Sequence, residues 1–498
     1  MIQRISMIAC VLLATAAAAS NGRYEPTWSS VDSRPTPEWW SHAKFGIFIH
    51  WGVYAVPSFA SQGEYAEWYW ERIGKPGNPD GASKDAQIRR EARAFHERVY
   101  GRDFQYFDFA PLFRAEMFDA NGWAELFHRS GAKYVVLVSK HHDGFALWPS
   151  READVSWGRP WNSTAVGPRR DLVGELTDAV RKRGLRMGFY FSLYEWFNPL
   201  WLTGDTAAYV ERHLFPQFKD LVTRYAPSVI FSDGEWDLPS EQWRAPELLA
   251  WLFNDSPVAS EVVVNDRWGK ETRHRHGGYY TTEYGAGLPG ASHPWEENRG
   301  LGYSYGFNRN ENLDDYATGQ RLLLTLLDTV SRGGNLLLNV GPTADGRIPV
   351  VMQDRLAHLG QWLAHNGEAV YGTRTFRDGA QWSAGRRQEV DTSTNYRAKY
   401  DVEQITLAPA PGDARKEILF TRKGSTLYAI LTRYPRGEFV LRDLKLPAKA
   451  RVTLLGAPRL RIGWRQKGPD VVVAAPAIGD GEMPFEGPRT FKIELALP

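Results

Sequence analysis

Short apolar runs that end abruptly in polar residues recur along most of the chain. In one of them, residues 229–231 (Val-Ile-Phe) lead directly into Ser232, Asp233 and Gly234. An apolar run of this length that is bounded by a turn residue is typical of a buried strand. Comparable apolar or aromatic runs lie at 45–49, 134–138, 185–191, 262–264, 277–282 and 335–340. The pattern predicts a set of buried strands with polar side chains at their ends.

Helical patterns separate these runs. The clearest begins at Asp171, which can cap a helix, and places Leu172, Leu176 and Val180 on one face before Gly184 ends it. Other helical patterns cover residues 119–131, 206–225 (interrupted at Pro216), 322–330 and 351–365. Regular alternation of buried strands and helices predicts an α/β fold with a (β/α)8-like barrel.

The periodicity changes near residue 376. Two short apolar stretches, 418–420 and 427–431, flank Lys423 and Gly424, a pattern that predicts a β-hairpin. Further short strands are expected at 451–455 and 471–474. We therefore expect the barrel domain to cover residues 24–375 and a C-terminal β-sandwich domain to cover residues 376–498.

The N-terminal segment has the features of a signal peptide over residues 1–20. Arg4 precedes an apolar stretch over residues 5–19, and the small residues expected at a cleavage site lie at its end, at 16–20. We expect export to a periplasmic, extracellular or lysosome-like compartment; an uncleaved anchor or a lipid at Cys10 is the alternative. Cys10 is the sole cysteine, so its removal would exclude disulfides, a cysteine-ligated zinc and a cysteine nucleophile.

Charge excludes two classes of partner. The 60 basic residues nearly balance 58 acidic ones, which gives a net charge of +2 and no field for nucleic acid or an anionic membrane surface. No later stretch reaches the ~20 apolar residues of a membrane span. Aromatic residues are abundant, and their flat faces suit sugar rings, although a large core also uses them.

The strand ends carry the candidate chemistry, because barrel active sites lie at the C-terminal ends of the strands. Asp233 stands at such an end and is our candidate nucleophile; the alternative is a loop aspartate that caps the next helix. Arg267 follows another strand and could keep Asp233 ionised. Its alternative role is a structural salt bridge with Asp266 or Glu283.

Histidines also follow two predicted strands, at His50 and at the pair His141-His142. One reading is a metal site with His50, His142 and Asp233 as ligands. These strands contain no HxxxH or HxH pair, and the HxH that begins at His274 lies in a charged loop. We therefore expect no metal and no cofactor.

A second carboxyl group is needed for glycoside hydrolysis, in which one acid protonates the leaving group and the other attacks or activates water. Glu283 follows the aromatic run and lies beside Tyr280 and Tyr284. A carboxyl group among aromatic side chains retains its proton more readily, as a general acid must. Glu296, which follows Trp295, is the alternative acid.

Six motifs resemble the α-L-fucosidases of glycoside hydrolase family 29, and they occur in the same order. They are FGIFIHWG (45–52), the Glu67-Trp68 pair, KHHDGFALW (140–148), SDGEW (232–236), VNDRWG (264–269) and GGNLLLNVGPTADG (333–346). The resemblance covers the barrel half and fits a trailing β-sandwich. It implies cleavage of terminal α-L-fucose with retention, through a covalent fucosyl-aspartate and without a metal.

The resemblance also implies roles for individual residues. Asp233 resembles the nucleophile, and Tyr305 falls where the family places an aromatic ring against the methyl group of the sugar. The TTEY stretch points to Glu283 as the acid/base, with Glu296 in WEEN as the alternative. The remaining positions, which would bind sugar hydroxyls or line the pocket, are His50, Glu67, Trp68, His141, His142, Tyr190 and Arg267.

The sequence thus predicts an exported exo-α-L-fucosidase that acts on a fucosylated glycan or oligosaccharide. One alternative is a carbohydrate-binding protein that has lost its chemistry, which the presence of both Asp233 and Glu283 disfavours. Another is a related glycosidase for a different sugar. The linkage, the aglycone and assembly into a homo-oligomer are left open.

Overall fold

The first part of the chain forms an eight-stranded parallel sheet. The computed structural model describes residues 22–75, 83–288, 290, 292–388, 400–479 and 482–495. The predicted signal peptide, with Cys10, lies outside the described residues. The order in the sheet is β5-β4-β3-β2-β1-β8-β7-β6. In chain order the strands are β1 (Phe45–Ile49), β2 (Tyr134–Lys140), β3 (Arg186–Ser192), β4 (Val229–Asp233), β5 (Val263–Val264), β6 (Tyr280–Glu283), β7 (Trp295–Gly300) and β8 (Asn335–Val340).

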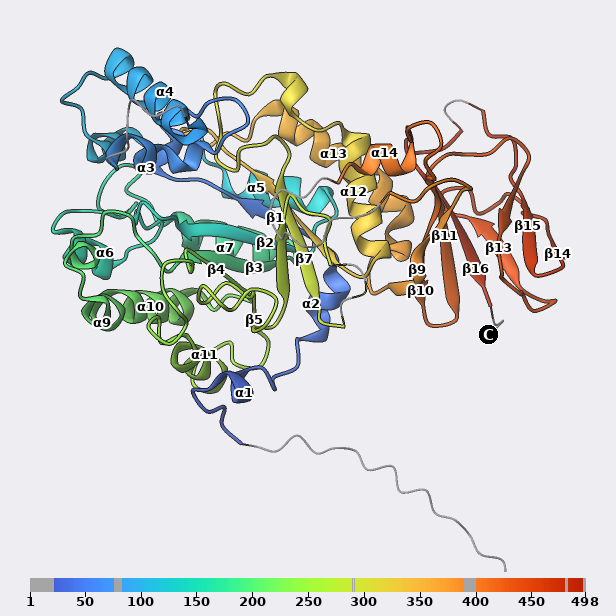
Figure 1. Ribbon diagram of the computed structural model, residues 1–498, viewed down its shortest axis with the longest axis horizontal. Coiled ribbons are helices and arrows are strands. Elements are labelled where there is room, and N and C mark those ends of the chain that lie inside the picture. Colours follow the sequence, from blue (N-terminus) through green and yellow to red (C-terminus); the bar gives the residue numbers. More distant parts are fainter. Residues whose placement is uncertain are drawn as a thin grey trace, which may run out of the picture.

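The two outer strands of this order meet and close the sheet. The main-chain N–H groups of Gly278 and Tyr279 donate to the carbonyl of Val264 at 3.0 and 3.2 Å, which joins the end of β5 to the start of β6. The helices that cover the barrel include α5 (Ala120–Arg129), α7 (Leu172–Lys182), α10 (Phe215–Tyr225), α11 (Ala245–Asn254), α12 (Gly319–Ser331) and α13 (Val350–Asn366) (Figure 1). The predicted (β/α)8-like barrel is confirmed.

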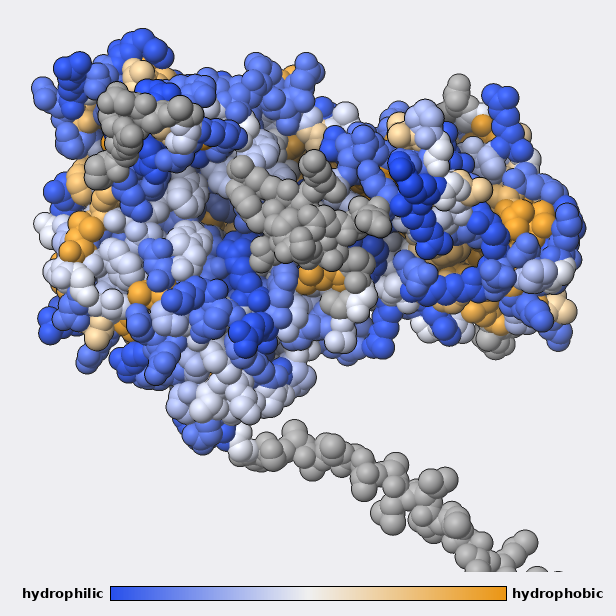
Figure 2. Space-filling view, in the orientation of Figure 1, coloured by the Kyte–Doolittle hydropathy of each residue, from blue (hydrophilic) through white to orange (hydrophobic). Residues whose placement is uncertain are grey.

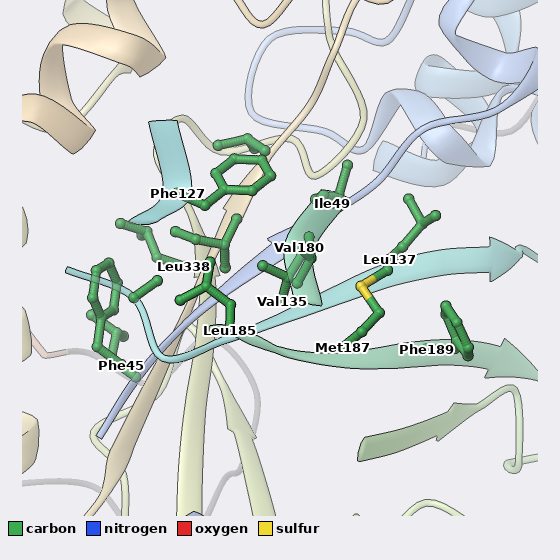
Figure 3. Packing of buried hydrophobic residues seen from close by; sticks show 14 of the residues in the cluster. Phe45, Ile49, Phe127, Val135, Leu137, Val180, Leu185, Met187, Phe189 and Leu338 are labelled. Atoms are coloured by element: carbon green, nitrogen blue, oxygen red, sulfur yellow. The ribbon is translucent and has the colours of Figure 1, made fainter. Parts of the chain in front are cut away.

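Side chains along each strand point alternately outward and inward, so the barrel has an outer and an inner core. In β2, Val135 and Leu137 point outward and pack with Phe127 of α5 and Val180 of α7 (Figure 3). The intervening Val136 belongs to a separate inner cluster. Because successive strand side chains point to opposite faces, one apolar run supplies both cores.

Local signals place several helices as expected. The carboxylate of Asp171 accepts the N–H of Gly174 at 2.9 Å and caps α7. The stretch over 206–225 begins with α9 (Thr206–Tyr209) and reaches α10 through a π-helical turn, η4 (Val210–Leu214). The irregular turn therefore ends at Leu214, and Pro216, where the interruption was predicted, lies in the first turn of α10.

Strand β7 was not predicted from the sequence. Its residues, WEENRG, contain only one apolar side chain, yet all except Arg299 are buried. Glu296 pairs with Thr281 of β6 and with Asn335 of β8. The strand forms because its neighbours supply main-chain partners and a polar interior, and neither can be read from the segment alone.

The C-terminal residues form two antiparallel sheets. One has the order β13-β16-β11-β10-β9 and the other β12-β15-β14. The predicted hairpin is present, with Lys423 opposite Thr426. The strands are β9 (Arg374–Trp382), β10 (Lys416–Lys423), β11 (Thr426–Leu431), β12 (Glu438–Leu441), β13 (Arg451–Leu454), β14 (Trp464–Lys467), β15 (Asp470–Ala474) and β16 (Arg489–Glu494).

Helix α12 lies between the barrel and this C-terminal domain (Figure 1). A buried ion pair connects Asp328 of α12 with Lys416 of β10. Hydrophilic residues cover most of the face in Figure 2, and the larger apolar groups lie over the C-terminal domain. Within the described part of the chain, no helix has the length and apolar character to cross a membrane.

Candidate active site

A pocket of about 300 Å³ opens at the C-terminal ends of the barrel strands. The structure brings nearly all the sequence-predicted site residues into its lining. They are His50, Glu67, Trp68, His141, Tyr190, Asp233, Arg267, Glu283 and Tyr305. His142 lies directly behind the lining, and Glu296 lies deeper in the barrel.

Asp233 is the last residue of β4. Gly234 follows with φ 75°, a left-handed conformation that favours glycine and turns the chain sharply after the carboxylate. The Asp233 Oδ2 atom accepts the hydroxyl of Tyr190 at 2.9 Å, and Oδ1 accepts Nη1 of Arg267 at 2.9 Å. Helix α11 has Arg244 at its N-cap, so Asp233 does not cap the next helix.

The surroundings of Asp233 keep it ionised. Burial alone would raise its pKa, but the Arg267 charge, the hydrogen bond from His142 and the Arg273 charge together hold the pKa of Asp233 well below its ordinary value. Both carboxylate oxygens therefore carry negative charge into the pocket at neutral pH, as a nucleophile requires.

One guanidinium connects the two candidate carboxyl groups. Nη1 of Arg267 contacts Asp233, and Nη2 contacts Oε2 of Glu283 at 3.2 Å. The other oxygen of Glu283 accepts the hydroxyl of Tyr65 at 2.9 Å. Asp266, the alternative partner of Arg267, instead accepts hydrogen bonds from Thr281. The planar fork of Arg267 thus places both acids at one pocket.

His50 and Tyr305 are held by the same side chain. Asn339 of β8 lies 2.7 Å from Nδ1 of His50 through its Oδ1, and its Nδ2 donates to the carbonyl of Tyr305 at 2.7 Å. Burial lowers the pKa of His50 to about 3, so its ring is neutral. Because Oδ1 of an amide only accepts, His50 donates from Nδ1 and keeps Nε2 as a hydrogen-bond acceptor.

The adjacent histidines take different places. His141 lines the pocket, and its ring is stacked with Tyr190 at 5.6 Å and 9°. Burial lowers the pKa of His141 well below its ordinary value, so this ring is also neutral. His142 holds Ser192 Oγ at 2.5 Å through Nδ1, while its Nε2 lies 3.5 Å from Oδ2 of Asp233. His142 therefore contacts the candidate nucleophile.

Glu67 and Trp68 form another side of the pocket. The Oε2 atom of Glu67 accepts the N–H of Gly306 at 2.8 Å, which connects it to the loop that carries Tyr305. Burial raises the pKa of Glu67 to about 7. The ring of Trp68 stacks on Trp236 at 6.1 Å and 23°, which gives the pocket an aromatic side.

Six lining residues were missed by the sequence analysis: Phe48, Tyr65, Phe231, Trp236, Arg273 and Asn298. Trp236 belongs to the SDGEW motif, and Tyr65 precedes Glu67 by two positions, so a wider reading of those motifs could have included them. Asn298 lies on the unrecognised β7. Arg273 comes from a charged loop that gave no signal.

The other acids near Asp233 are engaged elsewhere or exposed. Glu235 is buried and accepts Nε of Arg273 at 2.5 Å. Burial, together with the charge of Asp233, raises the pKa of Glu235 against the opposing charge of Arg273. Asp237 is exposed. Asp233 is thus the member of this turn that contacts both Arg267 and Tyr190.

Glu296 lies below the pocket rather than in its lining. It is the second residue of β7, is fully buried, and accepts the hydroxyl of Tyr134. Burial raises the pKa of Glu296 to about 8, so it is protonated at neutral pH. Its neighbour two residues along the strand, Asn298, reaches the pocket. Of the two candidate acids, Glu283 is therefore the one that lines the pocket.

We expect Glu296→Gln to stabilise the protein at high pH. The pKa of this carboxyl rises from 4.5 to about 8 on folding, so the unfolded chain releases a proton that the folded protein keeps. The unfolding free energy therefore falls as pH rises through this window. Glutamine removes that loss and still accepts from Tyr134.

The test compares the melting temperatures of wild type and variant at pH 5 and pH 9. The advantage of the variant should grow with pH, by about 1 °C for each kcal/mol gained in a chain of this length. Glu241→Gln, at an exposed position, is the control and should show no such trend. A constant difference at both pH values would contradict the assignment.

No group of three or more His, Cys, Asp or Glu side chains is placed to hold a metal ion among the residues that the structure describes. The proposed ligands His50, His142 and Asp233 are instead bonded to Asn339, Ser192 and Arg267.

Comparison with known proteins agrees with this geometry. The family model described as alpha-L-fucosidase matches residues 11–368. An alpha-L-fucosidase of Dictyostelium discoideum is 46% identical over 363 residues, which cover 71% of this chain and 76% of that protein. The tissue alpha-L-fucosidase of Homo sapiens is 40% identical over 483 residues, 95% of this chain and 92% of that protein.

A solved structure extends the likeness to the whole fold. The Thermotoga maritima alpha-fucosidase in complex with fucose has a TM-score of 0.73 and 33% sequence identity, and the match covers 95% of this chain and 100% of that one. Relatives and structure thus point to the same glycoside hydrolases as the pocket does. The chain belongs to the α-L-fucosidase family.

Proposed function

We propose that the protein is a retaining exo-α-L-fucosidase that releases terminal α-L-fucose through a covalent fucosyl-aspartate. The observation that carries this proposal is the contact of one guanidinium, Arg267, with both Asp233 and Glu283 in a single pocket. The pocket is of a size to take one monosaccharide, and the Thermotoga maritima relative binds fucose.

On this geometry we assign one carboxyl to each role. Asp233 is ionised by Arg267 and attacks the anomeric carbon. Glu283 protonates the departing oxygen and then removes a proton from the water that hydrolyses the ester. His50, neutral with Nε2 free to accept, and Glu67 hold sugar hydroxyls. Tyr305 lies beside His50, with ring centroids 4.8 Å apart, where it can contact the methyl group.

The spacing of the two acids distinguishes retention from inversion. Retaining glycosidases hold their carboxyl groups ~5–5.5 Å apart, whereas inverting enzymes need ~6.5–9.5 Å to admit a water molecule. In a crystal structure with bound fucose we expect the shorter spacing between Asp233 and Glu283. A spacing in the longer range, with water between the acids, would refute retention.

A panel of 4-nitrophenyl glycosides tests the function itself. We expect turnover of the α-L-fucoside and little turnover of the β-L-fucoside, the α-L-rhamnoside or the α- and β-D-galactosides. Turnover of another sugar in preference would indicate a related glycosidase. Binding of fucose without turnover of any glycoside would indicate a carbohydrate-binding protein.

We expect activity to survive EDTA, because the histidines of the pocket already have roles as neutral hydrogen-bonding groups. The measurement is turnover of the α-L-fucoside before and after dialysis against the chelator. Loss of activity that zinc restores would overturn the histidine assignments.

We also propose that the substrate is a fucosylated glycan or oligosaccharide met outside the cytoplasm. This rests on the apolar segment over residues 5–19. Mass spectrometry of the purified native protein would locate the N-terminus, and a chain that still begins at Met1 would contradict cleavage.

A further inference from the structure

A buried charged cluster lies behind the two histidines and has no part in the chemistry above. Glu195 follows β3 and is completely buried. Its Oε1 accepts Lys140 Nζ at 2.5 Å and His213 Nε2 at 2.6 Å. Its Oε2 accepts Trp157 Nε1 at 3.0 Å and Asn198 Nδ2 at 2.6 Å. Four donors thus fill the acceptor positions of one carboxylate.

These donors come from segments that surround the turn over residues 141–144, which carries His141 and His142 and is called the histidine turn below. Lys140 is the last residue of β2 and immediately precedes His141. His213 lies in the π-helical turn η4, and such turns frequently occur at functional sites. A third donor, Trp157, is the last residue of α6 (Arg151–Trp157). Through Glu195, the end of β2 is tied to the loop that follows β3.

The main chain of the turn also packs on Glu195. Gly144, with φ 74°, lies so close that a Cβ atom there would be 2.7 Å from Oε2 of Glu195. On the other side, the N–H of Trp196 donates to the carbonyl of His142 at 2.9 Å. The turn is therefore fixed by a side chain and by the main chain of the same loop.

The turn presents both histidines to the site. His141 lines the pocket, and Nε2 of His142 lies 3.3 Å from the hydroxyl of Tyr190 and 3.5 Å from Asp233. Hydrogen bonds weaken steeply with distance and angle, so a small displacement of this turn would disturb sugar binding and the nucleophile together.

A gain in the stability of the folded protein does not by itself explain why this charged cluster is present. Removing an ammonium and a carboxylate from water is costly, and an apolar pair of similar volume is often as stable. A carboxylate with four directed bonds instead fixes one position. We propose that Glu195 is a positioning residue, which acts through Lys140 to hold His141 and His142 in place for sugar binding and for alignment of Asp233.

The inference rests on the proposed function, and its test uses variants of the full chain. Lys140→Met and Glu195→Gln remove the charge pair. His213→Leu removes one donor and leaves the other three. The matched control is Lys416→Met, which breaks another buried lysine–carboxylate pair, with Asp328, neither of which lines the pocket.

Each variant is assayed with 4-nitrophenyl α-L-fucoside at a temperature at which circular dichroism shows it fully folded. We expect Lys140→Met and Glu195→Gln to lower kcat/KM about 10²-fold, the effect of misplacing reacting groups by ~1 Å. In the same two variants, KM for the fucoside and the inhibition constant of fucose should both rise. Lys416→Met should lower only the melting temperature.

The proposal is overturned if Lys140→Met and Glu195→Gln match Lys416→Met, with lower melting temperatures and unchanged kcat, KM and fucose inhibition. If Glu195→Gln does not fold, Lys140→Met and His213→Leu are judged by the same criterion. Failure of the proposed function would look different, because wild type would then not turn over the fucoside, or Asp233→Gly would remain active.

Discussion

Asp233→Gly is expected to reduce turnover of 4-nitrophenyl α-L-fucoside by 10⁴-fold or more, on the order of the losses seen when a nucleophile is removed. Binding of fucose should be largely retained, because His50, His141 and Glu67 still line the pocket. The variant also opens a small space on the face of the sugar opposite the leaving group. Azide can enter this space and attack once, so the product should be β-L-fucosyl azide.

The anomeric configuration of the azide product, measured by NMR, checks this prediction. Glu235→Gln and Asp237→Asn are the neighbouring controls. Both should keep substantial activity without azide, because neither side chain contacts Tyr190 or Arg267 in the way that Asp233 does. An α product from Asp233→Gly, or full activity without azide, would remove Asp233 from its role.

Glu283→Ala is expected to separate the two steps of the reaction. A 4-nitrophenolate leaving group needs little protonation, so the first step should survive. The second step then lacks its general base, and the fucosyl-enzyme should accumulate. Azide needs no base and should release α-L-fucosyl azide, with net retention. For an unactivated fucosyl oligosaccharide, loss of the acid should cost about 10²–10⁴-fold in rate.

Glu296→Gln is the matched control for the acid assignment. Glu296 lies below the pocket and is bonded to Tyr134, so this variant should hydrolyse both substrates at nearly the wild-type rate. The measurement is the ratio of rates on the aryl fucoside and on the oligosaccharide. If Glu296→Gln shows the selective loss and Glu283→Ala does not, the acid is Glu296.

Local sequence patterns sufficed for much of the fold. The apolar run of β2, the Asp171 cap of α7 and the hairpin around Gly424 depend on neighbouring residues, and each was read from a short segment. Strand β7 was missed because its buried side chains are polar. Its partners, Thr281 and Asn335, come from other strands, so burial could be decided only in the assembled barrel.

The residues of the site also fall into those that local patterns predicted and those that only the folded structure brought in. Polar residues at strand ends identified Asp233, His50 and Arg267, because parallel strands bring their C-terminal ends to one edge. Loops supplied Tyr65 and Arg273, two of the residues that were missed. Tyr65 reaches Glu283 across 218 positions of the chain, and Arg273 reaches Glu235 across 38. No periodicity relates residues that meet only through tertiary folding.

The sequence by itself determined the barrel, the candidate nucleophile and the resemblance to the family, because these depend on local pattern and motif. Only the tertiary structure decided which carboxyl groups share Arg267, and that Glu283 lines the pocket while Glu296 lies beneath it. It also separated the adjacent histidines, one in the lining of the pocket and one beside Asp233. Distance, burial and charge at a site depend on segments far apart in the chain, which meet only when the protein folds.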